Sequence, residues 1–487
     1  MSRQKEPLDA AEIERLWKEC FAGDAQQALS SLCALCRDSR AAELINGMPD
    51  RRSLDALLSS QKPKVRKNAA RLIGEIMQPN DVSSLLRALE NEKTYFVAPS
   101  IILALGNSKS AFAPDAIRAF VDALPPDAEE KQREEITQAA QTALSRLIER
   151  EHPEFTGLDR PRVFLLTSAC SCSRAIMDEA AEKGVKADLQ QNGVLLQSDD
   201  YGGLFKLRCF DEALIRLCRA ESREPEKIAA AIAKSDVMEL AARYSAAPQY
   251  RLEVRNAAPQ EKTEIIAAVK KAVPLVNSPS SYDMELRIEP DKSGAQVYVK
   301  LYIPKDPRFA YRKGSISASI SPSTAASIMR LSKKYLKPDG RALDPCCGSG
   351  TLLIERARLM PHGELVGVDI DMEALRVARE NVKASGEKIA LIGGDLRKFK
   401  PDAPFDELFA NLPFGSRVGS KSSNTQLYST LVSRLDELLK PDGTAFLYTT
   451  QLAPLERLLE KSGWGTAEKI RLEAGGLLPY LVTVRKK

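Results

Sequence analysis

The chain has 487 residues, of which 44% are hydrophobic and 28% charged, and its formal net charge is +5. Such a length predicts about three domains, and the composition excludes a fibrous or disordered protein. The small positive charge is compatible with nucleic acid but does not argue for it, because binding depends on where the charges lie. Apolar runs are too short for a membrane span. The charged N-terminus is not expected to be a signal peptide.

Residues 1–155 are predicted to be almost continuously helical. The stretches 54–76 and 82–108 look like one repeated unit, because in each a short amphipathic helix and a turn precede a second helix. The second helices close on similar triplets, ending at Gly74 and Gly106, and a third pair is expected from Pro114 to Arg150. Tandem pairs of about thirty residues resemble HEAT repeats and favour a solenoid that binds a partner or acts as a spacer. A plain helical bundle is the alternative.

The cysteines predict a reducing environment. They number nine, which is odd, and they are scattered along the chain, so free thiols in the cytoplasm are expected. Cys33 and Cys36 form a CxxC pair within a predicted helix, but the chain has only two histidines and no second ligand pair near this one. We therefore expect buried cysteines here and no metal site.

The segment 152–162 contains two prolines and a glycine and predicts a domain boundary. Beyond it the pattern mixes strands and helices. Strands are expected at 163–166, 193–197, 250–256, 282–290 and 295–303, and helices at 173–182, 211–219 and 261–273. This pattern predicts a small α+β domain with an open sheet.

From residue 319 onwards strands and helices alternate strictly. The first predicted strand, 341–344, runs into a glycine-rich turn and the helix 351–359, and a second strand follows at 364–369. Further alternating elements continue to the C-terminus. This order predicts a Rossmann-like, doubly wound and mostly parallel sheet, with ligands at the carboxyl ends of its strands.

The glycine-rich turn reads Asp-Pro-Cys-Cys-Gly-Ser-Gly-Thr over residues 344–351. Gly348 and Gly350 permit positive φ and close approach of a ligand, yet Leu353 replaces the third glycine of a dinucleotide site and the lysine of a P-loop is missing. An acid at position 344 would repel phosphate but suits a cation. The turn therefore predicts S-adenosylmethionine, which has an ammonium group, a sulfonium and no phosphate.

Two further acids follow at successive strand ends. Asp369 is placed to bind ribose hydroxyls, and Asp395 to accept from the adenine amino group, with the Leu396 N–H nearby. Asp371 is expected to be only a helix cap. The predicted cofactor-binding residues are Asp344, Cys346, Gly348, Gly350, Asp369, Ile370, Asp395 and Leu396.

The fourth strand of this region ends in Asn-Leu-Pro-Phe-Gly, residues 411–415. The exocyclic amine of a purine is a poor nucleophile, because its lone pair is delocalised into the ring. The Asn411 side-chain oxygen and the Leu412 carbonyl would accept its hydrogens and aim the lone pair at a methyl group, and Phe414 would stack on the base. The predicted catalytic residues are Asn411, Leu412, Pro413 and Phe414. A simple strand-end turn is the alternative.

The two motifs together resemble the amino-methylating class of S-adenosylmethionine-dependent methyltransferases, whose motif is commonly [D/N]-P-P-[F/Y]. Leu412 departs from that pattern. With the stretch 309–332, they more specifically resemble the THUMP-containing guanine-N2 RNA methyltransferases over residues 160–487. The resemblance implies a ferredoxin-like and THUMP-like RNA-binding module at 160–310 and a methyltransferase domain at 319–487. The helical region 1–155 lies outside the family pattern. Its role is left open between a contact with RNA and the binding of a protein partner.

The expected activity is methyl transfer to the N2 amine of a guanosine in structured RNA, first of all tRNA. Ribosomal RNA, DNA adenine N6 and protein glutamine are the other amino substrates considered, and an inactive RNA-binding scaffold is the alternative outside enzymes. The basic residues that could contact phosphates are Arg308, Arg312, Lys333, Lys334, Arg417, Arg485, Lys486 and Lys487.

Overall fold

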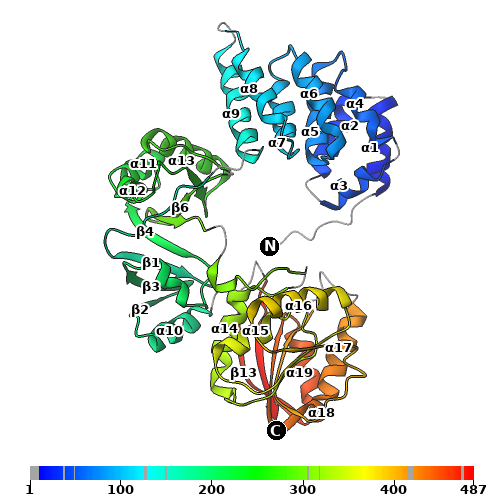
Figure 1. Cartoon of the computed structure of the whole chain (residues 1–487), viewed down its shortest axis with the longest axis vertical. Coiled ribbons are helices and arrows are strands. Elements are labelled where there is room, and N and C mark those ends of the chain that lie inside the picture. The colour runs from blue at the N-terminus through cyan, green and yellow to red at the C-terminus, as the bar shows by residue number, and fades with distance from the viewer. Residues whose placement is uncertain are drawn as a thin grey trace. The chain divides into compact units, whose positions relative to one another are not determined.

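The computed structural model describes residues 10–22, 24–36, 39–48, 50–125, 129–147, 151–169, 171–279, 281–303, 306–316, 319–413, 421–472 and 477–487. The chain divides into two compact units, and Figure 1 traces it from the N-terminus in blue to the C-terminus in red. The first contains Met1–Glu154, Tyr244–Glu253 and Val273–Glu285, and the second contains Phe155–Arg243, Val254–Ala272 and Leu286–Lys487. None of the described helices is long and apolar enough to cross a membrane.

The N-terminal part is helical, as predicted, and its successive helices contact one another. Its α-helices are α1 (Ala10–Ala22), α2 (Ala25–Leu35), α3 (Ser39–Asn46), α4 (Leu54–Leu57), α5 (Pro63–Glu75), α6 (Val82–Asn91), α7 (Ala98–Gly106), α8 (Ala113–Asp122) and α9 (Glu130–Leu147). Short 3-10 turns, η1 (Arg51–Ser53) and η2 (Pro79–Asp81), precede α4 and α6. The two predicted repeat units are thus the pairs α4–α5 and α6–α7, and α8–α9 is the third.

The glycines that close the second helices allow these helices to pack closely. A Cβ at Gly74 would lie 3.2 Å from Cα of Ala104 in the next pair, and one at Gly106 would lie 2.8 Å from Cα of Ala143 in α9. The Asn107 side chain also donates to the Gly74 carbonyl at 3.0 Å. The same contact therefore recurs from pair to pair, which explains the repeated Gly in the sequence.

The predicted cysteine pair lies in the core of this helical part. Cys33 and Cys36 are both buried, and burial raises their pKa values to about 11 and about 12. The expectation of buried cysteines is confirmed. Among the residues that the structure describes, no group of three or more His, Cys, Asp or Glu side chains is arranged to hold a metal ion.

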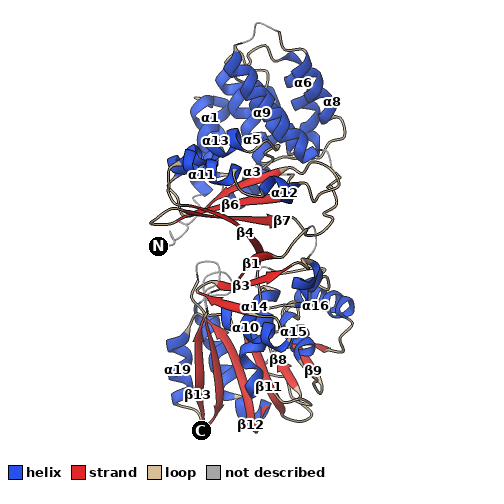
Figure 2. Cartoon of the chain, turned by 90° about the vertical axis from the view of Figure 1, so that its left-hand side faces the viewer, coloured by secondary structure: helices blue, strands red, loops and turns tan. Residues whose placement is uncertain are grey.

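The middle part contains a seven-stranded sheet in the order β2-β3-β1-β4-β7-β6-β5 (Figure 2). Its strands are β1 (Arg162–Thr167), β2 (Ala187–Gln190), β3 (Gly193–Ser198), β4 (Ala213–Ala220), β5 (Tyr250–Val254), β6 (Met284–Pro290) and β7 (Ala295–Leu301). Its helices are α10 (Ser173–Glu182), η3 (Gly202–Lys206), α11 (Pro225–Ala233), α12 (Val237–Ala241) and α13 (Pro259–Ala272).

One predicted element of this sheet is wrong. Residues 211–219 were expected to be helical, but the segment forms the central strand β4, antiparallel to β1 through the Phe164 and Ile215 pair and to β7 on its other edge. Its first three residues, at 213–215, are all buried, so the sequence lacks the strict alternation of a half-exposed strand. A continuous apolar run does not distinguish a buried strand from a helix, and tertiary pairing decides here.

The C-terminal part is a second seven-stranded sheet in the order β10-β9-β8-β11-β12-β14-β13. The strands are β8 (Ala342–Asp344), β9 (Leu365–Asp369), β10 (Ala390–Gly393), β11 (Phe405–Asn411), β12 (Leu439–Thr449), β13 (Trp464–Arg471) and β14 (Tyr480–Lys486). The helices are η4 (Pro307–Phe309), α14 (Pro322–Ser332), η5 (Lys333–Tyr335), α15 (Thr351–Leu359), α16 (Met372–Ser385), α17 (Lys421–Ser433), α18 (Leu435–Leu438) and α19 (Leu452–Glu460). The first five strands in the order are parallel and β14 is antiparallel. The predicted Rossmann-like alternation is confirmed.

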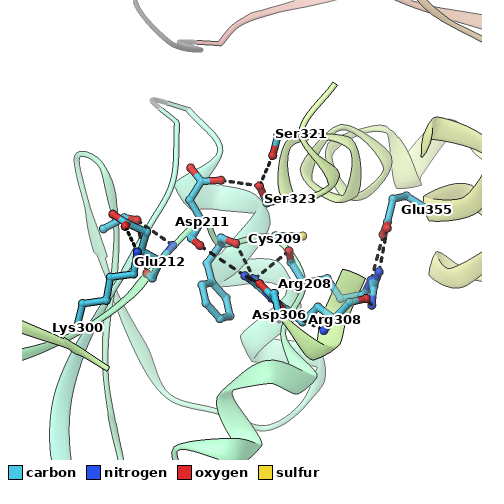
Figure 3. A network of polar contacts seen from close by, with 12 residues as sticks. Arg208, Cys209, Asp211, Glu212, Lys300, Asp306, Arg308, Ser321, Ser323 and Glu355 are labelled. Atoms are coloured by element: carbon cyan, nitrogen blue, oxygen red, sulfur yellow. Dashed lines mark hydrogen bonds and ion pairs between the residues drawn. The ribbon is translucent and has the colours of Figure 1, made fainter. Parts of the chain in front are cut away.

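Within the second unit, polar contacts join the segment before β4 to the helices of the C-terminal sheet (Figure 3). The Arg208 guanidinium donates to both carboxylate oxygens of Glu355 on α15, at 3.0 and 2.8 Å, and Glu355 is almost fully buried. The Tyr311 hydroxyl donates to the same carboxylate at 2.6 Å. Ser323 on α14 donates to Asp211 at 2.5 Å. These contacts fix the two sheets of this unit against each other.

Arg308 belongs to this network and is not a surface residue. Its side chain is only 1% exposed and stacks on Phe210, 3.7 Å from guanidinium carbon to ring centroid. The guanidinium donates to the Phe210 carbonyl at 2.6 Å and to Asp306. The expectation that Arg308 contacts phosphate is therefore wrong, because aromatic residues from a distant segment cover it.

Candidate functional site

The carboxyl ends of four parallel strands meet at one edge of the C-terminal sheet. Gly393 of β10 pairs with Asp369 of β9, and Asp344 of β8 pairs with Gly367 of β9. β11 lies on the other side of β8 and ends at Asn411. The register therefore places the three predicted acids and the Asn411 motif at the same edge, as the sequence predicted.

The turn after β8 is built on two glycines with positive φ. Gly348 has φ 52° and Gly350 has φ 78°, and Gly350 is the N-cap of α15. L-residues rarely adopt these angles. The Gly348 amide donates to the Asp369 carboxylate at 2.7 Å, and the Cys347 amide donates to the Val368 carbonyl at 3.0 Å. The turn is thus held against the end of β9.

Asp344 is a buried acid without a cationic partner among the residues described. It is 1% exposed and accepts one bond, from the Cys346 amide at 3.1 Å. Burial raises the pKa of its carboxyl to about 8, with a further contribution from the charge of Asp369. The Cys346 amide stabilises the ionised form only in part, so a cation from a bound ligand would stabilise it further.

Asp369 and Asp371 take different roles after β9. The Asp369 carboxylate accepts from Gly348 with one oxygen and from the Asp371 amide with the other, at 2.9 Å. Asp371 accepts from the Glu373 amide at 2.9 Å and is the N-cap of α16, so its predicted role as a cap is confirmed. Ile370 lies between these two acids in the sequence, and its apolar side chain is 69% exposed.

Asp395 is engaged by its own turn. Its carboxylate accepts from the Arg397 amide at 2.8 Å and forms an ion pair with the Arg397 side chain, which is mostly exposed. The hydrogen bond from Arg397 lowers the pKa of Asp395. Leu396 is buried beside it. Cys346 is partly exposed, and burial raises the pKa of its thiol strongly, with the neighbouring acids adding to the shift.

Asn381 ties the segment 311–316 to the glycine turn, and no sequence motif predicted it. This side chain on α16 is fully buried. Its oxygen accepts from the amides of Lys313 and Gly314 at 2.8 and 3.1 Å, and its amide group donates to the carbonyls of Gly314 and Ser349 at 3.1 and 3.0 Å. The sequence did contain one signal for it, because Asn381 lies on the same face of the amphipathic helix as the Ala and Val positions that are buried.

The motif after β11 is supported by hydrogen bonds. The Leu412 amide donates to the Tyr448 carbonyl of β12 at 2.9 Å, a bond that a proline at this position would lack. The buried Tyr428 of α17 lies within hydrogen-bond distance of the Pro413 carbonyl, at 3.2 Å, and of the Thr449 hydroxyl. The rigidity expected from a proline at position 412 is thus supplied in part by these bonds. Phe414 and Arg417 lie outside the described residues.

Most of the remaining basic residues expected at phosphates contact other groups of the protein, whereas Arg485 is exposed, and Lys487 donates to the Leu459 and Ser462 carbonyls at 3.3 Å. Lys333 pairs with Glu182, Lys334 with Glu468, and Lys486 with Asp436. Arg312 donates to the Ile320 carbonyl at 2.8 Å, and burial lowers its pKa. Exposed pairs of this kind are weak, so the lysines keep the ability to exchange partners.

The C-terminal part is similar to known methyltransferases. Residues 310–479 match the UPF0020 family, described as RMKL-like, methyltransferase domain. The tRNA (guanine(6)-N2)-methyltransferase of Thermus thermophilus is 30% identical over 207 residues, which are 41% of this chain and 60% of that protein. The tRNA1(Val) (adenine(37)-N6)-methyltransferase of Vibrio campbellii is 25% identical over 149 residues, 28% of this chain and 62% of that protein.

A solved structure extends the likeness in fold beyond the matched domain. SMU.472, a protein crystallised with SAH, aligns with a TM-score of 0.56 at 19% identity, over 68% of this chain and 99% of that one. The aligned share is larger than the C-terminal sheet alone, so it includes part of the middle region. The chain spans about 60% of the length of the two curated relatives named above. Residues 310–479 thus match a methyltransferase domain family, and they have a Rossmann-like fold.

Proposed function

We propose that this chain transfers a methyl group from S-adenosylmethionine to the exocyclic N2 amine of a guanosine in structured RNA, with tRNA in the cytoplasm as the expected substrate. The observation that carries the proposal is the buried, uncompensated Asp344 in a glycine turn at the same sheet edge as Asn411. The likeness to the guanine-N2 tRNA enzyme of Thermus thermophilus supports the choice of base.

The residues at this edge fit the methyl donor, which supplies an electrophilic methyl group on a sulfonium. Asp344 would hold its ammonium group, and Asp369 would accept from the ribose hydroxyls. A Cβ at Gly348 would approach the Ile316 side chain to 3.3 Å, so glycine keeps the turn open there.

The base of the donor would lie farther along the same edge. Asp395 and the Leu396 amide would hold the adenine, flanked by Ile370 and Cys346. The exposed Arg397 would leave Asp395 at little cost, because a surface ion pair contributes at most about 1 kcal/mol.

The Asn411 motif would activate the amine by position. The Asn411 side-chain oxygen and the Leu412 carbonyl would accept the two amine hydrogens, so that the nitrogen lone pair points away from them. Phe414 would stack on the extruded base, and Pro413 would hold the turn. Preorganised acceptors of this kind act without a protein nucleophile or a metal ion, and the amine loses one proton to water after transfer.

We further propose three parts for the chain. Residues 1–155 form HEAT-like repeats, 160–310 a ferredoxin-like and THUMP-like module that holds RNA, and 319–487 the methyltransferase domain. The repeated glycine contacts between helix pairs support the first part, and the network around Glu355 supports a fixed position of the second against the third.

Other amino substrates share the same chemistry. The Vibrio campbellii relative methylates adenine N6 by its name, and an adenine, like a guanine, offers an NH₂ group on an sp² carbon. Ribosomal RNA and DNA adenine are therefore the alternative substrates. An inactive scaffold is disfavoured, because Asp344, both turn glycines and Asn411 are present.

The test is tritium transfer from labelled S-adenosylmethionine to total tRNA, rRNA and duplex DNA, followed by nucleoside analysis. N2-methylguanosine in tRNA is the expected product. Label in N6-methyladenine would move the assignment to the adenine substrates. Donor binding without transfer to any nucleic acid would contradict an RNA methyltransferase.

A further inference from the structure

A row of basic residues lies on one face of α5 in the helical part. Residues 56–74 contain five basic residues and no acidic one. Four of them, Lys62, Lys64, Lys67 and Arg71, are at least partly exposed, and the last three follow one another at spacings of three and four residues, which places them on one helical face. We call these four residues the α5 ridge.

The ridge forms no ion pair with the residues that the structure describes. The fifth basic residue of the segment, Arg66, points to Glu92 and forms a two-bond pair with it at 2.8 and 2.7 Å. For the four ridge residues, by contrast, no carboxylate of the described residues lies within ion-pair distance. Lys64, Lys67 and Arg71 on one helical face repel one another, so stability alone does not account for them.

An exposed aromatic ring stands next to the ridge. Phe96, in the segment before α7, is 37% exposed, and the Lys67 ammonium lies 5.7 Å from the centroid of its ring. A large apolar ring at the surface costs free energy that burial against a partner would recover. Any of the four bases can stack on such a ring, while adjacent cations bind the phosphates.

We propose that the α5 ridge and Phe96 form a second RNA-binding surface, which contacts the phosphate backbone and one unpaired base of the substrate RNA. The proposal rests on the proposed function, because that function makes RNA the polyanion that this chain meets. The surface is independent of base sequence, since phosphates carry no sequence information. It gives the helical part a role in substrate affinity.

The experiment uses the full chain and total tRNA as the probe, with affinity measured by fluorescence anisotropy over a range of salt concentrations. The ridge variant is Lys64→Gln/Lys67→Gln/Arg71→Gln, and a Phe96→Ala variant tests the ring. The matched control is Lys18→Gln/Lys131→Gln, two exposed lysines of the same helical part. Circular dichroism reports whether the helical part of each variant is folded, and binding of S-adenosylmethionine, measured by calorimetry, reports on the proposed donor site.

The ridge variant is expected to bind tRNA about ten-fold more weakly. The slope of the logarithm of the binding constant against the logarithm of the salt concentration should become shallower by about 3, because each of the three substituted cations would no longer neutralise a phosphate. Phe96→Ala is expected to weaken binding about five-fold, since a stacked base contributes about 1 kcal/mol or more. The control should match the wild type. Unchanged tRNA affinity in the ridge variant would overturn the proposal, even if the ridge then proved to hold an acidic protein.

The outcomes separate this surface from the catalytic assignment. If the wild type methylates tRNA and the ridge variant binds it equally well, the proposed function stands and the ridge proposal fails. If the ridge variant loses tRNA affinity while the wild type methylates no RNA, the surface stands and the proposed function fails. A wild type that binds no tRNA would refute the surface directly.

Discussion

Replacing Asp344 by Asn should make the chain more stable and at the same time destroy its donor site. The isosteric amide keeps the bond from the Cys346 amide but has no proton to lose. In the unfolded chain the carboxyl titrates near pH 3.8, whereas in the folded chain its pKa is raised to about 8. Between these values the folded state binds more protons, so the stability of the wild type falls as pH rises through this window.

The size of the effect follows from the two pKa values. At pH 7 the wild type lies roughly three pH units above the unfolded pKa, and each unit corresponds to about 1.4 kcal/mol. Asp344→Asn is therefore expected to stabilise the C-terminal part by up to about 4 kcal/mol at pH 7 and by almost nothing at pH 4. For a domain of this size that corresponds to about 10 °C in Tm.

The assay is thermal unfolding of the ligand-free chain between pH 4 and pH 8, with the relevant transition identified in the wild type by its shift in S-adenosylmethionine. The variant should also bind the donor at least 30-fold more weakly, because a charge partner of the ammonium is removed, worth about 2 kcal/mol. Asp371→Asn, an exposed cap that Asn also fills, is the control. Lower stability of Asp344→Asn at pH 7, or unchanged donor affinity, would refute the reasoning.

Four substitutions test the other assignments. Asn411→Ala should abolish methyl transfer with donor affinity kept in calorimetry, and equal loss of both would make the residue structural. Asp369→Ala should weaken donor binding, and unchanged affinity would contradict the ribose role. Tyr428→Phe removes a hydroxyl bonded behind the motif and should lower kcat about ten-fold with an unchanged donor Kd; a normal kcat in single-turnover assays would exclude positioning by Tyr428. Leu412→Pro deletes the amide donor to β12 and should likewise lower kcat; a faster enzyme would show that the bond is dispensable.

The sequence predicted the candidate site well where the local pattern of strands, helices and glycines determines the backbone. Strand and helix alternation placed Asp344, Asp369 and Asn411 at strand ends, and the two glycines marked a turn that requires positive φ. These features are local, since each depends on a few neighbouring residues. The parallel register then brings the strand ends together without further information from the side chains.

The sequence predicted the structure poorly where contacts between distant segments determine it. A helix was expected where β4 lies, because the pairing of this strand with β1 and β7 involves residues about 50 and 80 positions away. Arg308 was expected at the surface, although the Phe210 ring covers it. Tyr428 and Asn381 gave no motif, and only the fold shows that both lie behind the candidate site.

The four hydrogen bonds of Asn381 also have a consequence for local motion. One buried side chain accepts from the amides of Lys313 and Gly314, and the Lys313 amide also donates to the Tyr311 carbonyl at 2.9 Å. These two amide protons are therefore exposed to solvent only when the Asn381 side chain and this turn both open. The same event frees the Ser349 carbonyl in the glycine turn. We therefore expect segment 311–316 and the glycine turn to open together. The two amides should exchange with deuterium at a common slow rate, which makes them a natural reporter of whether the turn is closed.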